Sequence, residues 1–207
     1  NYKNFLFLGK NFMRIAKFIS HSGYCSRREA EELIYSKRVM VNGYLCISPA
    51  INVSESDLIQ VDYREIKLQD EIKLWKFHKP VGVITTTKDP LKRKTVFDLI
   101  PKNLPRLMPI GRLDRKSEGL LLLTNNGTLS RYFELPKNKI IRVYSVRVKG
   151  KVEENQLNVI RRGIKVDRVR YAPIKVKVES YNISSTWLKM ELIEGKNREI
   201  RKICSQL

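Results

Sequence analysis

The sequence predicts an α+β fold, in which a small N-terminal α/β domain precedes a larger domain with a mixed, mainly antiparallel sheet. Early segments place apolar residues at helical spacing, whereas late segments alternate apolar and polar residues as antiparallel strands do. Strands and helices do not alternate strictly, which favours α+β over a doubly wound sheet. The charge is also uneven, because residues 74–207 carry 30 of the 41 Lys and Arg.

The first part of the chain predicts two helices. We expect residues 1–12 to be an extension without a fold of its own, because Met13-Arg14-Ile15 has the form of a natural start. Ser26 followed by Glu29 is a capping box, which would begin the second helix. Helical spacing is seen in two runs of apolar residues: Ile15, Phe18 and Ile19, then Ala30, Leu33 and Ile34.

A hairpin and a strand are expected to complete this domain, residues 13–62. The run VMVNGYLC predicts a hairpin that turns at Asn42-Gly43, and DLIQVD predicts a further strand. The mixed-charge run at residues 63–73 has no strong turn signal and is the candidate linker.

From residue 74 onward, apolar segments broken by Gly and Pro predict the larger domain, residues 74–207. Strands are expected in LWKFHKPVGVITTT, RLMPIGRLD and GLLLLTNNG, and longer antiparallel strands in IIRVYSVRVKG and IKVKVESYNISSTWLKMELIEG. Helical spacing is present in KTVFDLI, TLSRYFEL and ENQLNVIRRGI, and Pro136 would end the second of these helices.

The composition indicates a polyanionic partner. A formal net charge of +20 and a pI near 10.0 are typical of nucleic-acid binding. A basic membrane-surface protein would need an amphipathic basic helix or an anchor, and the sequence shows neither. Widely spaced Cys25, Cys46 and Cys204 predict neither a disulfide framework nor a metal site, so we expect a cytoplasmic, reducing location.

Residues 14–62 resemble the S4 domain, a small RNA-binding module, through RIAKFISHSGYCSRREAEELIYSKRVMVNG. The resemblance implies RNA binding through Arg27, Arg28, Lys37 and Arg38. Independently, Arg27 and Arg28 fall in the first turn of a predicted helix, where they oppose its dipole. Contact with phosphate would make that position favourable, although basic residues are common in first turns.

Asp114 is the acidic residue that stands out. It follows an apolar strand and lies between Arg112 and Arg115, directly before a stretch expected to form a tight turn. A carboxylate among guanidinium groups stays ionised at neutral pH, which suits a nucleophile better than a general acid. The residues alone leave another interpretation open, because an Asp flanked by arginines is more often a salt-bridged structural residue.

The run GRLDRKSEGLLLLTNNG, residues 111–127, resembles the signature of the pseudouridine synthases of the RsuA/RluB type, which modify ribosomal RNA. An S4 domain ahead of the catalytic domain is also the arrangement of this family. Three further stretches resemble the family in the expected order: HKPVGVITTTKDP at 78–90, RVYSVRVKG at 142–150 and EGKNREIRK at 194–202.

The resemblance implies roles for five residues. Asp114 matches the catalytic aspartate, which attacks the ribose or base of the target uridine, so that the N-glycosidic bond breaks and the uracil rejoins through carbon 5. Tyr144 matches the tyrosine that stacks on the uracil, and Ile200 the aliphatic residue on its other face. Arg201 matches the basic partner of the aspartate, and Arg112 the arginine that holds open the place of the flipped-out nucleotide. Stacking would offset an extrusion cost of a few kcal/mol.

The family's activity implies an isomerisation that needs neither a cofactor nor a metal. The implied partner is ribosomal RNA or a pre-ribosomal particle, with large-subunit RNA favoured. We expect the protein to be a monomer and to have no membrane partner. Two alternatives remain: a non-catalytic RNA-binding or ribosome-assembly protein that keeps the fold, and a general cationic RNA chaperone. Asn126 stands where the family commonly has Asp, and Asn-Gly still makes a turn. Family members continue past the last motif, so we expect the catalytic domain to be incomplete at its C-terminus, with Ile200 and Arg201 near an unsupported chain end.

Overall fold

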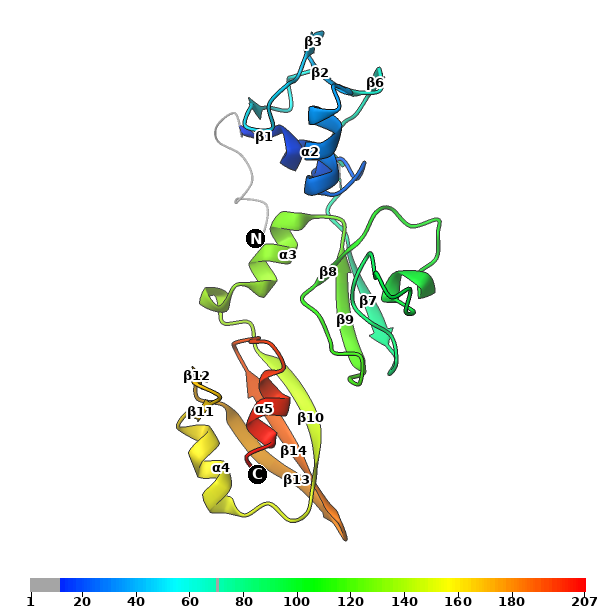
Figure 1. The fold of residues 1–207 in the computed structure, drawn as a ribbon. Coiled ribbons are helices and arrows are strands. Elements are labelled where there is room, and N and C mark those ends of the chain that lie inside the picture. The colour runs from blue at the N-terminus through cyan, green and yellow to red at the C-terminus, as the bar shows by residue number, and fades with distance from the viewer. Residues whose placement is uncertain (1–11, 70) are drawn as a thin grey trace. The chain divides into compact units, whose positions relative to one another are not determined.

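The computed structural model describes residues 12–69 and 71–207. The chain divides into two compact units, Asn1–Ser130 and Arg131–Leu207 (Figure 1). Mixed helices and antiparallel sheets confirm the predicted α+β class. The predicted extension lies outside the described residues except for Phe12, as does Asp70 of the predicted linker.

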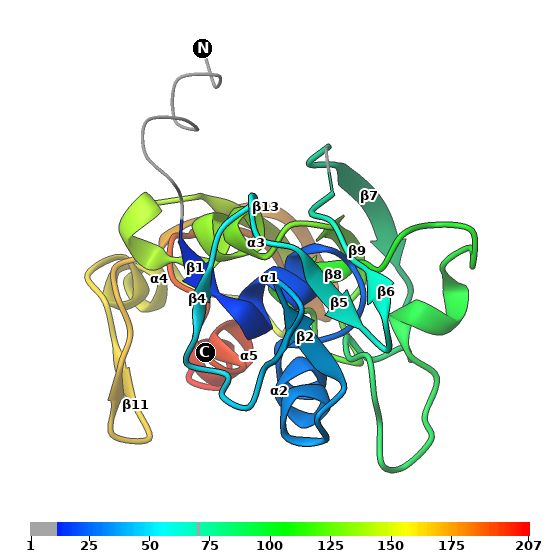
Figure 2. The ribbon, with the colours of Figure 1, turned by 90° about the horizontal axis from the view of Figure 1, so that it is seen from above.

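The N-terminal part of the first unit packs helices against short antiparallel strands. The sheet order is β3-β2-β5-β6, with β1 and β4 forming a separate pair, and Figure 2 shows β2 beside β5. Apolar side chains from both helices and the strands form one buried cluster. Its elements are β1 (Met13–Arg14), α1 (Ile15–His21), α2 (Arg27–Tyr35), β2 (Val39–Val41), β3 (Tyr44–Leu45), β4 (Asn52–Val53), β5 (Ile59–Val61) and β6 (Arg64–Glu65).

Local sequence signals account for these elements. The Ser26 side chain accepts a hydrogen bond from the Glu29 amide and the Glu29 carboxylate accepts one from the Ser26 amide, which confirms the capping box at the start of α2. Asn42 and Gly43 both have positive φ, 51° and 84°, as a two-residue hairpin turn requires. β6 lies inside the predicted linker and pairs with β5, so that part of the run is ordered by the sheet.

The rest of the first unit contains a sheet of order β7-β9-β8, all antiparallel. The predicted helix in KTVFDLI is only a short 3-10 helix, because Thr95 and Asp98 cap it at one end and Pro101 follows soon after the other. A buried apolar cluster lies beneath it. The elements are β7 (Leu74–Lys79), η2 (Val96–Leu99), β8 (Met108–Ile110), β9 (Gly119–Thr124) and α3 (Gly127–Glu134), which Pro136 follows as predicted.

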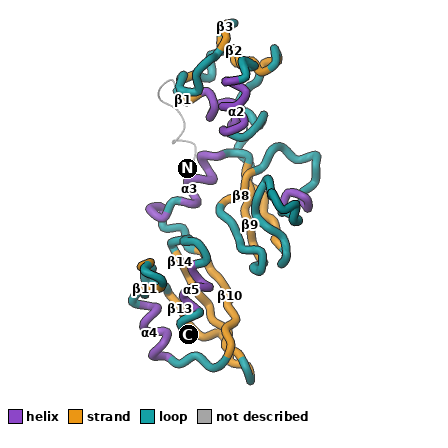
Figure 3. Tube along the Cα trace, viewed as in Figure 1, coloured by secondary structure: helices purple, strands orange, loops and turns teal. Residues whose placement is uncertain are grey.

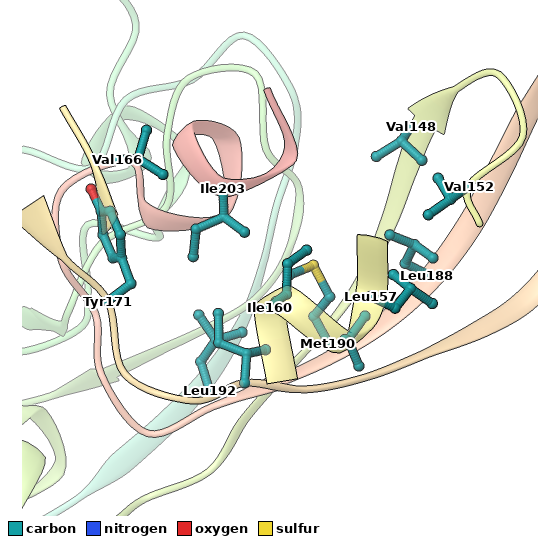
Figure 4. Packing of buried hydrophobic residues seen from close by; sticks show 12 residues of the cluster. Val148, Val152, Leu157, Ile160, Val166, Tyr171, Leu188, Met190, Leu192 and Ile203 are labelled. Atoms are coloured by element: carbon teal, nitrogen blue, oxygen red, sulfur yellow. The ribbon is translucent and has the colours of Figure 1, made fainter. Parts of the chain in front are cut away.

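The second unit is a three-stranded sheet of order β10-β14-β13 with helices on one face (Figure 3). Leu157 and Ile160 of α4 and Ile203 of α5 pack on the same cluster of sheet side chains (Figure 4). The elements are η3 (Pro136–Asn138), β10 (Arg142–Lys149), α4 (Glu154–Arg161), β11 (Lys165–Val166), β12 (Val169–Arg170), β13 (Lys175–Asn182), β14 (Ser185–Leu192) and α5 (Glu199–Cys204).

Candidate active site

Asp114 lies in the loop between β8 and β9, at the start of a turn. The Ser117 amide donates to the Asp114 carbonyl at 3.0 Å, which closes the turn predicted to follow the aspartate. Asp114 itself is half-buried, whereas its neighbours Arg112 and Arg115 are exposed.

Segment 80–85, which follows β7, holds the Asp114 loop on both sides of the aspartate. On one side, the Thr85 hydroxyl donates to the Leu113 carbonyl at 3.2 Å and accepts from the Leu113 amide at 3.4 Å. On the other side, the Gly82 amide donates to the Arg115 carbonyl at 2.7 Å. The backbone of Asp114 is therefore fixed at both neighbouring residues.

Lys79, the last residue of β7, supports the same turn from inside the unit. The whole residue is buried, at 0% exposure, and its ammonium donates to the Ser117 carbonyl at 2.8 Å and the Pro80 carbonyl at 3.0 Å. Burial lowers the pKa of Lys79, while the carboxylates of Asp114 and Glu118 oppose that shift. A buried charge is costly unless it is paired, so the turn and the nearby acids explain why the fold keeps it.

Lys79 was not among the residues singled out from the sequence. The run Lys79-Pro80 did carry a signal. Lys79 ends a strand and lies on the same face as side chains that point to the core, so its ammonium needs a hydrogen-bond partner inside the fold. Thr85 was missed for a different reason. A hydroxyl that bonds a distant backbone segment leaves no pattern in sequence.

The second unit positions Tyr144 and Ile200 on one apolar cluster. Tyr144 lies on β10 opposite Met190 of β14, and Ile200 lies in the first turn of α5. Both are partly buried and pack against the cluster that contains Met190. Arg201, the next residue of α5, is half-buried.

α5 is well supported. Ile203 is completely buried, and the Gln156 side-chain amide of α4 donates to the Leu207 carbonyl at 3.0 Å. The Glu199 carboxylate accepts from the Lys196 amide at 2.8 Å, and burial raises the pKa of Glu199. α5 is therefore held in place by its own buried side chains, while the expectation that the catalytic domain is incomplete at its C-terminus stays a prediction.

The predicted site residues therefore fall into two groups, one in each unit. Asp114 and Arg112 lie in the first unit, and Tyr144, Ile200 and Arg201 lie in the second. The pairing of Asp114 with Arg201 stays a prediction, as does the placing of a base between Tyr144 and Ile200.

The predicted RNA-binding residues of the N-terminal domain differ in their surroundings. Arg27 and Arg28 are exposed in the first turn of α2. Lys37 is exposed and has a positive φ of 58°. Arg38 makes a two-pronged ion pair with Asp62, with Nε–Oδ1 at 2.7 Å and Nη2–Oδ2 at 2.5 Å, so this side chain already has a carboxylate partner.

Neither a metal-binding cluster nor a membrane-spanning helix is present in the part of the chain that the structure describes. No group of three or more His, Cys, Asp or Glu side chains could hold a metal ion. None of the helices in residues 12–69 and 71–207 is long and apolar enough to cross a membrane.

Comparison with known proteins connects this geometry to a family. The model of the RNA pseudouridylate synthases matches residues 73–206, and the S4 domain model matches residues 13–59. The chain belongs to the RNA pseudouridylate synthase family. It is therefore an RNA-modifying isomerase with an N-terminal S4 domain.

Individual pseudouridylate synthases agree with this assignment. An uncharacterized RNA pseudouridine synthase of Rickettsia felis is 50% identical over 190 residues, which are 92% of this chain and 82% of the relative. The ribosomal large subunit pseudouridine synthase B of Bacillus subtilis is 37% identical over 193 residues, 92% of this chain and 78% of the relative. A crystal structure of a pseudouridylate synthase shares the fold, with a TM-score of 0.62, 24% identity, and coverage of 94% of this chain and 83% of that chain.

Proposed function

We propose that this pseudouridylate synthase converts a specific uridine of ribosomal RNA, in the large subunit, into pseudouridine, with Asp114 as the catalytic residue. The observation that carries the role of Asp114 is the fixing of its loop at Leu113 and at Arg115 by the segment after β7. A catalytic group held in one position reaches its target without a further ordering cost. The large-subunit substrate is supported by the similarity to the ribosomal large subunit pseudouridine synthase B of Bacillus subtilis.

The chemistry is an isomerisation. The bond between N1 of the uracil and C1′ of the ribose breaks, and a bond between C5 and C1′ forms. C5 gives up a proton and N1 gains one, so the reaction balances without a redox partner, water or a cofactor. Asp114 acts as the nucleophile toward the ribose or base during this exchange.

Four other residues complete the proposal. Tyr144 stacks on one face of the flipped-out uracil, and Ile200 packs against the other. Arg201 serves as the basic partner of Asp114. Arg112 occupies the gap that the nucleotide leaves in the RNA.

The N-terminal domain serves as the RNA-binding module in this proposal. This domain comprises residues 13–62, followed by a linker at 63–73 and the catalytic domain at 74–207. Arg27, Arg28 and Lys37 contact the RNA, and Arg38 makes a secondary contact. We further propose that the enzyme acts in the cytoplasm as a monomer on ribosomal RNA or a pre-ribosomal particle. The formal net charge of +20 supports a polyanionic substrate such as ribosomal RNA.

Tritium release tests this function. The substrate is ribosomal RNA labelled with tritium at C5 of uridine, because each isomerisation replaces the C5–H bond. The protein should release tritium and saturate at a small number of sites per RNA, while Asp114→Asn should release none. Equal release above background from the two proteins would refute the catalytic role of Asp114. Background release from both would favour a non-catalytic RNA-binding protein. Release without saturation would contradict a specific site.

A further inference from the structure

The first unit contains a groove that extends from the proposed RNA contacts Arg27 and Arg28 to residues without an assigned role. It has a volume of about 850 Å³ and is formed by the start of α2 together with residues 86–88 and 97–107. One wall is thus part of the S4 domain, and the other belongs to the first half of the catalytic domain. A volume of this size lies within the usual range for ligand-binding clefts.

The rim of the groove is basic. Five basic side chains line it: Arg27, Arg28, Lys88, Lys102 and Arg106. The acidic lining residues are Glu29 and Glu32. Because five bases face two acids, the groove carries a net positive charge and attracts anions.

Glu29 is already committed to other partners. Its carboxylate accepts from Lys88 Nζ at 2.6 Å and caps α2 through the Ser26 amide. The hydrogen bond from Lys88, followed by those from Ser26, lowers the pKa of Glu29 to about 2. Glu29 thus pairs with Lys88 and caps α2, so it does not neutralise the arginines of the rim, which can bind an anion.

The remaining bases lack partners in residues 12–69 and 71–207. Neither an ion pair nor a side-chain hydrogen bond engages Arg27, Arg28, Lys102 or Arg106 there. Arg106 is the most enclosed of the four, half-buried and close enough to Cys25 to lower the pKa of that thiol, against the larger effect of burial. An arginine held in a half-buried position without a carboxylate partner is suited to a bidentate contact with phosphate.

The floor of the groove is apolar and rigid. Phe97, Ile100 and Leu104 line it and pack against the buried cluster that contains Val96 and Leu107. Pro101 and Pro105 restrict the backbone of the loop between them. A basic rim over an apolar floor matches a sugar–phosphate chain, which presents charged oxygens on one side and the carbons of ribose on the other.

We propose that this groove binds the sugar–phosphate backbone of the RNA substrate, with Arg106 and Lys102 on the catalytic side and Arg27 and Arg28 on the S4 side. The inference rests on the proposed function only in taking RNA as the substrate. Backbone contacts position a nucleic acid and carry no sequence information. The groove then sets the register of the RNA on the enzyme, and the choice of uridine is made elsewhere.

RNA binding as a function of salt tests the groove. The probe is a 5′-fluorescein-labelled RNA stem–loop with single-stranded flanks, which suffices because backbone contacts do not depend on sequence. The variant is Lys102→Ala/Arg106→Ala, and the matched control is Arg64→Ala/Lys67→Ala, which removes the same charge from exposed positions outside the groove. Loss of two phosphate contacts should reduce the slope of log K against log salt by about 1.4–1.8, and the control should change it far less.

The proposal is overturned if the groove variant and the control have the same affinity and slope. It is also overturned if the groove variant loses binding to a labelled poly-glutamate peptide but not to RNA, which would indicate an acidic protein partner. Arg106→Lys keeps the charge but not the planar guanidinium fork, so it should keep the salt slope and lose part of the affinity while the thermal midpoint is unchanged, as a bidentate contact requires. Because tritium release is not measured in this experiment, loss of the proposed function and loss of the groove remain distinguishable.

Discussion

The buried ammonium of Lys79 donates a hydrogen bond to the Ser117 carbonyl, 2.8 Å away, and so ties the end of β7 to the turn that begins at Asp114. This bond couples a residue of the sheet to the turn that carries the proposed catalytic carboxylate of Asp114. Together with the hydrogen bonds of Thr85 to Leu113 and of Gly82 to Arg115, it holds the loop at Ser117 and on both sides of the aspartate.

Replacing Lys79 should therefore destabilise the first unit. Lys79→Met removes the ammonium that donates to both the Pro80 and Ser117 carbonyls, and each lost hydrogen bond to this charged group costs on the order of 1–3 kcal/mol. Urea unfolding measures the loss. Lys76→Met is the control, because Lys76 lies on the same strand but is exposed. An unfolding free energy equal to that of the control would contradict the structural role of Lys79.

Thr85→Val should impair catalysis more than folding. The change removes the hydroxyl that bonds both the carbonyl and the amide of Leu113, at a net cost of about 1 kcal/mol in stability. The Asp114 loop then gains freedom, so we expect a lower kcat with KM little changed, measured by tritium release. Thr128→Val, at an exposed position, is the control. An unchanged kcat would show that Asp114 does not depend on this attachment.

Tyr144→Leu should slow the reaction by removing the aromatic face proposed to stack on the uracil. Base–aromatic stacking is worth about 1–3 kcal/mol, and Tyr144→Phe should keep most of it. Single-turnover rates on one rRNA transcript compare the two variants. Tyr181→Leu serves as a control, since Tyr181 is exposed on β13. If the leucine variant reacts as fast as the phenylalanine variant, stacking is not the role of Tyr144.

Glu29 should make the first unit sensitive to acid. Its folded-state pKa of about 2 lies below the ordinary value of 4.5, so its contribution to stability is complete above pH 4.5 and is lost as the pH falls towards 2. The difference in unfolding free energy between the protein and Glu29→Gln should shrink over that range. The control is Glu31→Gln on the same helix, and a difference that stays constant with pH would contradict the assignment.

The sequence predicted elements that depend on local signals. The capping box at Ser26 and Glu29 and the Asn42-Gly43 turn are decided by neighbouring residues, and both are confirmed. In KTVFDLI the apolar spacing suggested a helix, but the Thr95–Asp98 cap and Pro101 leave room only for a single 3-10 turn. The strand β6 was missed because pairing with β5 orders a run that has no strong propensity of its own.

Contacts between distant segments could not be predicted. The attachment of Leu113 to Thr85 joins residues 28 positions apart, and the bond from Lys79 to Ser117 spans 38. Arg38 was expected to bind RNA from the resemblance to the S4 domain, and its pairing with Asp62 depends on the fold of that domain. The motif order identified Asp114, whereas the surroundings that hold Asp114 in place required the structure.

Pseudouridine mapping of ribosomal RNA from cells lacking the gene, complemented with either the natural protein or Asp114→Asn, tests the central claim most directly. The account predicts that one uridine of the large-subunit RNA loses its modification without the gene and regains it only with the natural protein. Restoration by Asp114→Asn, or a map that the gene does not change, would contradict it.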